Sequence, residues 1–234
     1  MTTQGNIVYN KSHAHRIDFR SAKRNPEMTE MCQDWKLNFL RCNPWLVNIP
    51  EDYISDRFNV FGLNDEFQFF LICCDIINGK TNLNAIAHCN IREIREQLPY
   101  VYGMIHARYI LSPEGLNAIL DRYKTKVYGT CPRVYCQDEA LLPIGPSSKL
   151  NESKVKTFCP VCREIFEPRP KIDLDGAFFG PNMAHIFIDE MKLMRRRANY
   201  VPFNHNAFGF RIRSPFFGTA KPEEEEEDEG EGED

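Results

Sequence analysis

The 234-residue sequence lacks the local motifs that mark the common enzyme classes. It has no glycine-rich phosphate-binding loop, no Gly-x-Ser-x-Gly, no His-Glu-x-x-His, and neither the His-Arg-Asp nor the Asp-Phe-Gly sequence of protein kinases. These absences leave no sequence signal for nucleotide hydrolysis, serine-type hydrolysis, metalloproteolysis or kinase catalysis. We therefore expect that the chain is not an enzyme.

Long apolar runs are also missing. No stretch approaches the eighteen uninterrupted apolar residues of a membrane-spanning helix, and the N-terminal sequence lacks the apolar centre of a secretory signal. We expect no membrane partner and a location in the cytoplasm and nucleus. Persistent disulfides are rare in these reducing compartments, so regular spacing among the nine cysteines favours metal binding.

Charge is distributed unevenly along the chain. The formal net charge is −4, but ten acidic residues lie between Glu223 and Asp234. Without these ten, 29 basic residues face 23 acidic ones, a net charge of +6. We interpret residues 1–24 as a flexible arm and residues 218–234 as a disordered acidic tail. The tail is either a solubilising segment or an attractor of polycations and basic substrates.

The periodicity of apolar residues divides the body into two parts. Residues 25–126 are mostly helical, because apolar residues recur there at three- and four-residue spacing. Individual helices are expected to end at Asn43-Pro44, to open at Pro50, and to cover 65–77, 91–98, 101–111 and the segment from Ser112. Residues 127–190 predict a small β domain with strands at 140–144 and 155–158. The fold class expected is therefore α+β.

Four cysteines of the second part have the spacing of metal ligands. They are Cys131 and Cys136, separated by four residues, and Cys159 and Cys162, separated by two. Two such pairs, joined by a hairpin-length connection, offer four thiolates from two turns, as a zinc ribbon does. We predict one structural Zn²⁺ per chain, because four protein ligands leave no open position for water or substrate. Cys73 and Cys74 are interpreted as core residues, and His106 as a packed residue rather than a catalyst.

A second pattern lies near the C-terminus. Phe208, Phe210 and Ile212 alternate with Gly209, Arg211 and Arg213, which suits a strand or hairpin with one apolar face. Such a face is either a docking edge for another protein or the last strand of the chain's own sheet.

Several of these segments together resemble the regulatory beta subunit of casein kinase II. The resemblance includes Cys-Pro-x-x-x-Cys at 131–136, Leu-Pro-Ile-Gly at 142–145, Cys-Pro-x-Cys at 159–162, Tyr-Gly-Met-Ile-His-Ala-Arg-Tyr-Ile-Leu at 102–111, and Asp-Gly-Ala-Phe-Phe-Gly at 175–180. It covers about residues 33–215 in the expected order.

The resemblance implies a regulatory subunit without kinase activity. Such a subunit forms a homodimer through its zinc ribbons, binds two catalytic alpha subunits, and modulates their activity and choice of protein substrates. Pro132 and Val134 are then candidates for the dimer interface. The segment 191–217 docks on the catalytic subunit, and Phe208 and Phe210 match the family's aromatic docking pair, with Ile212 beside them.

One departure from this family pattern lies in the helical domain. The usual acidic loop of the helical domain is replaced by a nearly uncharged segment, Ile-Cys-Cys-Asp-Ile-Ile-Asn-Gly-Lys-Thr-Asn-Leu-Asn. The basic body and the run Arg195-Arg196-Arg197 also leave an alternative, a zinc-ribbon protein that binds nucleic acid. Against this alternative, the aromatic residues are not interleaved with basic ones as a base-stacking surface requires.

Overall fold

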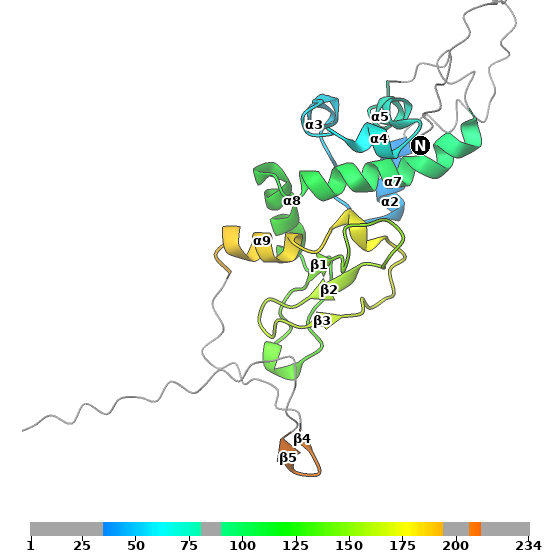
Figure 1. Ribbon diagram of the computed structural model, residues 1–234. Helices are drawn as coiled ribbons and strands as arrows, with labels where there is room; N and C mark the ends of the chain where they lie inside the picture. The colour runs from blue at the N-terminus through cyan, green and yellow to red at the C-terminus, as the bar shows by residue number, and fades with distance from the viewer. Residues whose placement is uncertain (1–34, 81–89, 194–205, 212–234) are drawn as a thin grey trace, which may run out of the picture. The chain divides into compact units, whose positions relative to one another are not determined.

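The computed structural model of the protein describes residues 35–80, 90–193 and 206–211 (Figure 1). The chain divides into two compact units after residue 196, and each is described here by itself. The predicted arm, the predicted acidic tail, the start of the first predicted helix, the Arg195–Arg197 run and Ile212 lie outside the described residues.

The first unit is an α+β structure, as the sequence predicted. Its helices are α2 (Trp35–Cys42), α3 (Glu51–Ser55), α4 (Leu63–Glu66), α5 (Phe70–Ile77), α7 (Ile91–Tyr109), α8 (Pro113–Lys124) and α9 (Met183–Glu190), with 3₁₀ helices η1 (Val134–Cys136) and η2 (Gly176–Phe178). Among the described helices, none has both the length and the apolar character that crossing a membrane requires.

Helix α7 is the axis on which the first unit is packed. The side chain of Asn90 caps its start by accepting a hydrogen bond from the backbone N–H of Arg92. α5 and η2 both pack against it, and Figure 1 shows α7 running between α3, α4 and α5 on one side and the sheet on the other. Gly103 permits the contact with η2, since a Cβ at this position would lie 2.1 Å from the ring of Phe178.

Two expected helix boundaries are wrong. The expected break at Pro99 is absent, and α7 continues through this proline. Conversely, the single helix expected over 65–77 is two helices, because the chain becomes extended at Phe67 before α5 begins. A side chain of α7 takes part in this break: Gln97 Oε1 accepts a hydrogen bond from the backbone N–H of Phe69 at 3.2 Å.

A non-helical segment, Trp45 to Ile49, forms part of the core between α2 and α3. Its buried backbone groups are satisfied by side chains of α7 and α8. Tyr102 Oη donates to the Val47 carbonyl oxygen at 2.7 Å, and Arg122 donates to the Leu46 carbonyl oxygen at 2.9 Å. These long-range bonds fix a connection that has no regular structure of its own.

The sheet has three short antiparallel strands in the order β1 (Leu142–Ile144), β2 (Lys156–Phe158) and β3 (Ile165–Phe166). Leu142 pairs with Phe158, and Thr157 pairs with Phe166. α9 packs against β1. The two expected strands are confirmed with slightly shorter limits, while β3 was not predicted because two residues are too few to show an alternating pattern.

The second unit contains a β-hairpin of β4 (Asn206–Ala207) and β5 (Phe210–Arg211). Phe208 and Gly209 form its turn, with φ angles of 52° and 85°. Positive φ at both central residues is the geometry of a tight turn whose twist matches that of the strands. Of the two forms expected from the sequence, strand or hairpin, the structure has the hairpin.

Candidate metal centre and docking surfaces

The structure brings together the four cysteines singled out by their spacing. The Sγ atoms of Cys131, Cys136, Cys159 and Cys162 all lie within 4.8 Å of one another. The Sγ atoms of Cys131 and Cys162 are 3.9 Å apart. A tetrahedral ion with bonds of about 2.3 Å to sulfur separates its ligands by roughly 3.8 Å, so the donor set fits Zn²⁺ in both kind and spacing.

Two backbone turns present the cysteines. In the first turn, the Cys136 N–H donates to the Arg133 carbonyl oxygen at 3.0 Å, and the Cys131 N–H donates to the Glu139 carbonyl oxygen at 2.8 Å. In the second, which joins β2 to β3, the Arg163 N–H donates to the Cys159 carbonyl oxygen at 2.8 Å. A salt bridge of 3.1 Å between Arg133 and Glu164 connects the two turns. Backbone hydrogen bonds and one salt bridge therefore position the four cysteines.

Burial governs the protonation of these thiols. Cys131, Cys136 and Cys159 are buried, and burial raises the pKa of all three, that of Cys136 to about 12. Thiols in this environment stay protonated unless a cation stabilises the thiolates. A divalent ion supplies that stabilisation, so metal binding at this cluster releases protons.

The outer surface of the first turn is apolar. Pro132 and Val134, both singled out from the sequence, are exposed, Val134 to 87%. Tyr135 of the first turn and Ile165, the first residue of β3, are also exposed large apolar residues, and the sequence analysis did not identify them. The only feature of the sequence that could have identified these two residues is their position next to the cysteines. These four residues, Pro132, Val134, Tyr135 and Ile165, are called the ribbon surface below.

The hairpin of the second unit presents two aromatic side chains to solvent. Phe208 is fully exposed at the turn, and Phe210 is 79% exposed on β5. A phenylalanine with positive φ is uncommon, because its Cβ crowds the backbone in this conformation. The hairpin is therefore an aromatic tip with both rings exposed to solvent.

The other histidine and cysteine residues weighed as candidate functional groups in the sequence are packed in the core. His106 is completely buried and, as predicted, is packed in the core. Cys73 and Cys74 are buried in α5, as predicted, and burial raises the pKa of both thiols to about 12. Both cysteines are therefore unreactive as nucleophiles near neutral pH.

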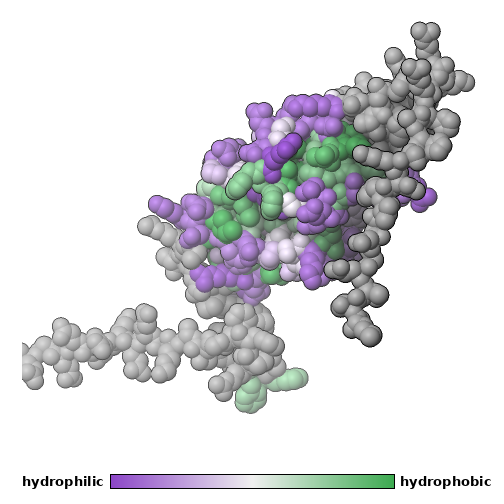
Figure 2. All heavy atoms as spheres, turned by 45° about the horizontal axis from the view of Figure 1, so that its top comes forward, coloured by the Kyte–Doolittle hydropathy of each residue, from purple (hydrophilic) through white to green (hydrophobic). Residues whose placement is uncertain are grey.

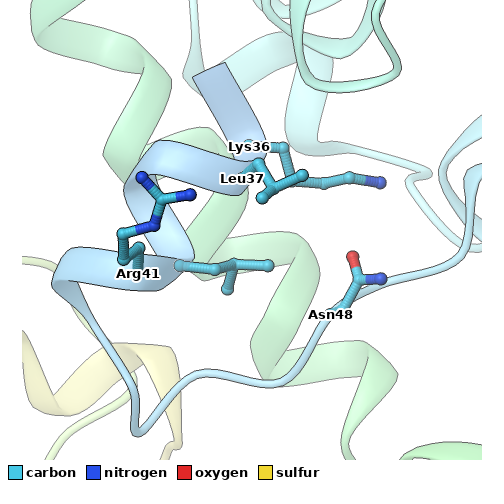
Figure 3. A pocket seen from close by; sticks show the side chains of 5 residues that line it. Lys36, Leu37, Arg41 and Asn48 are labelled. Atoms are coloured by element: carbon cyan, nitrogen blue, oxygen red, sulfur yellow. The ribbon is translucent and has the colours of Figure 1, made fainter. Parts of the chain in front are cut away.

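A hollow of about 360 Å³ lies between α2 and the segment that follows it (Figure 3). Its lining residues are Lys36, Leu37, Leu40, Arg41 and Asn48. Lys36 Nζ donates a hydrogen bond to the carbonyl oxygen of Ile49 at 3.2 Å, and burial lowers the pKa of this lysine. These described lining residues include no carboxylate, thiol or imidazole, so among them there is neither an acid–base pair nor an activated nucleophile.

Fold and site together define an α+β protein with a candidate four-cysteine metal centre and two apolar surfaces. Comparison with known proteins gives the family: the profile of the casein kinase II regulatory subunit matches residues 34–211. The chain belongs to this family. The match includes the four cysteines and the aromatic hairpin.

Named relatives agree with this assignment. Casein kinase II subunit beta of Schizosaccharomyces pombe is 31% identical over 83% of this chain and 84% of its own length. Casein kinase II subunit beta' of Drosophila melanogaster is 32% identical over 77% of this chain and 83% of its own length. Putative casein kinase II subunit beta-4 of Arabidopsis thaliana is 35% identical over 77% of this chain. The chain spans about 65% of the length of the Arabidopsis protein.

Proposed function

We propose that the chain is a non-catalytic regulatory and scaffolding subunit of a casein kinase II-type serine/threonine protein kinase. The observation that carries the proposal is the family match, because it covers the cysteine cluster and the aromatic hairpin in one alignment. It favours a kinase regulator over the alternative of a nucleic-acid-binding zinc ribbon. The expected location in the cytoplasm and nucleus rests on the sequence alone.

The metal in this proposal is one structural zinc ion per chain, held by Cys131, Cys136, Cys159 and Cys162. With four thiolates around it, the ion has no open coordination position and contributes folding energy rather than chemistry. Binding worth about 10–16 kcal/mol is large beside the small core that three short strands enclose. The spacing of the Sγ atoms supports this assignment.

Two separate surfaces bind the two kinds of partner, a second copy of the chain and the catalytic subunit. The ribbon surface, with Val134 exposed to 87%, serves as the interface of a homodimer. Exposed apolar side chains supported by a rigid metal centre supply the apolar core that a dimer interface needs. The hairpin tip, Phe208 and Phe210 with Ile212 beside them, docks on the catalytic subunit. Aromatic anchors of this kind dominate the binding energy of many interfaces.

Sedimentation of the full chain mixed with a casein kinase II catalytic subunit tests this proposal. We expect the chain alone to sediment as a dimer and the mixture to form a complex of two copies of each chain. A catalytic subunit that sediments separately from the full chain at micromolar concentration would contradict the proposed function. A complex with one copy of each chain would contradict the dimer while leaving kinase binding intact.

A further inference from the structure

Two aromatic side chains stand out from the turn between α3 and α4, far along the chain from the cysteine turns and the hairpin. Phe58 is 85% exposed and Phe61 is 81% exposed. Together they leave on the order of 300 Å² of ring surface in water. Apolar exposure of this size on one turn marks an interaction site more often than a packing fault. Neither residue belongs to the surfaces of the proposed function.

The turn that carries the two rings is firmly fixed. Asp56 Oδ1 accepts a hydrogen bond from the Phe58 N–H at 2.9 Å, and the Phe61 N–H donates to the Phe58 carbonyl oxygen at 3.4 Å. From below, the Arg108 guanidinium donates to the carbonyl oxygens of Asn59 at 3.1 Å and Phe61 at 2.8 Å.

The residues between and after the two rings anchor the turn in the core. Val60 lies between them and is buried, and so is Leu63, two positions after Phe61. Both rings are therefore presented by a preorganised backbone. A partner that binds them avoids much of the entropy cost of ordering a loop.

The surroundings of the turn are acidic. Residues 51–66 contain five exposed carboxylates and one basic residue, Arg57. The carboxylates belong to Glu51, Asp52, Asp56, Asp65 and Glu66. Arg108 holds the turn from α7, Lys80 pairs with Glu51, and Lys36 also interacts with Glu51. Asp75 in turn interacts with Lys80, so the balance is six acidic to four basic groups when these neighbours are counted. Figure 2, turned toward the side of α3, α4 and α5, shows apolar residues open to solvent among hydrophilic ones.

This combination specifies the chemistry of the occupant. Carboxylates attract lysine and arginine, the exposed faces of phenylalanine rings bind cations as well as apolar groups, and the rigid turn provides a fixed anchor. A second copy of this surface and the acidic residues 223–234 carry the same sign of charge and are disfavoured as occupants. The competing occupant is the chain's own basic segment, residues 1–24.

We propose that Phe58 and Phe61, with Asp56, Asp65 and Glu66, form a docking surface for a basic segment of a partner protein that carries apolar side chains between its lysines or arginines. The apolar side chains pack on the two rings, and the basic groups face the carboxylates. This surface works independently of the cysteine cluster and the hairpin, so it does not rest on the proposed function.

The test measures binding of a labelled peptide to the full chain without any kinase. The probe is a 12-residue peptide with four arginines placed around two leucines, followed by fluorescence polarisation. We expect Phe58→Ser with Phe61→Ser to weaken binding about tenfold, since aromatic anchors dominate such contacts. Asp65→Lys with Glu66→Lys should weaken it about fivefold at low salt and less at high salt, because salt screens exposed charges. Twin peptides with glutamate for arginine or serine for leucine should bind at least about tenfold more weakly.

Asp189→Lys with Glu190→Lys, a matched charge reversal on exposed residues of α9, is the control and should leave binding unchanged. Equal binding by the wild type and the Phe58→Ser, Phe61→Ser variant would overturn the proposal and would assign the peptide to another acidic segment. A drop of several degrees in the melting temperature of this variant would also overturn it, because rings docked by the chain's own segment contribute to folding. Dissociation of the dimer by the same variant would assign the surface to a second copy instead.

Discussion

Nδ1 of His106 lies 2.7 Å from the carbonyl oxygen of Phe178, and the two residues are 72 positions apart in the chain. On the other side of the ring, Nε2 accepts a hydrogen bond from the backbone N–H of Val47 at 3.1 Å. Because Nε2 must be the acceptor, the proton is on Nδ1 and is donated to Phe178. One neutral imidazole therefore joins the buried segment after α2, the helix α7, and η2, which follows β3 in the chain.

This arrangement predicts an acid-sensitive fold. Burial lowers the pKa of His106 to about 4, from about 6.5 in an unfolded chain. Between these values the unfolded state binds more protons, so the free energy of unfolding falls as the pH drops from 6.5 to 4. The full effect is about 3 kcal/mol. Urea unfolding at a series of pH values measures it.

His106→Gln is the comparison variant for this prediction. It should be less stable than the wild type at pH 7, because it loses one of two buried hydrogen bonds. The stability of the variant should also fall less steeply than that of the wild type between pH 6.5 and 4. Any loss of stability from protonation of the cysteine thiolates is common to both proteins and cancels in the difference. Parallel stability curves for the two proteins over this range would exclude His106 as the source.

The helix boundaries were predictable only where local chemistry set them. The start of α8 follows from the Ser112 cap and Pro113, and the structure has the helix there. Pro99 was expected to end a helix, but α7 passes through it because Leu98 and Val101 on either side are completely buried. This burial outweighs the cost of an interior proline, about 3 kcal/mol. Tertiary packing of this kind leaves no local mark in a sequence.

Some residues of the candidate sites could likewise be predicted from the sequence, and others could not. The four cysteines were recognisable because metal ligation imposes a fixed local spacing, and the fold brings their Sγ atoms together. The exposure of Tyr135, Ile165, Phe58 and Phe61 had no such signal. An aromatic or aliphatic residue has the same letter whether it is packed in the core or open to solvent, so only the folded structure separates the two.

Metal content is the next prediction. The purified chain should contain one zinc ion, and Cys159→Ser should lose it, because a missing thiolate opens the site to water and removes much of the ribbon's folding energy. Atomic emission spectrometry measures the ratio of metal to protein. Cys42→Ser is the matched control, since Cys42 is exposed and lies outside the cluster. A Cys159→Ser protein with one tightly bound zinc ion would contradict the assignment of the ligands.

A charge on the ribbon surface should separate the dimer. Val134→Asp places a carboxylate where the proposed interface excludes water, and burying an unpaired charge is costly. We expect the dimer dissociation constant, measured by sedimentation equilibrium, to rise at least about tenfold with zinc still bound. Leu71→Asp, which alters an exposed leucine of α5, should leave the dimer intact. Equal dissociation constants for Val134→Asp and the wild type would place the interface elsewhere.

The central claim is that this chain binds a protein kinase catalytic subunit through its hairpin, and calorimetric titration of that subunit tests it most directly. We predict that the full chain binds and that Phe208→Ala with Phe210→Ala weakens binding by about 3 kcal/mol, more than a hundredfold, while leaving the dimer and its zinc unchanged. Phe58→Ala with Phe61→Ala removes an equally exposed aromatic pair and should bind as the wild type does. Absence of binding by the wild type, or equal affinity for the wild type and the Phe208→Ala, Phe210→Ala variant, would contradict the account.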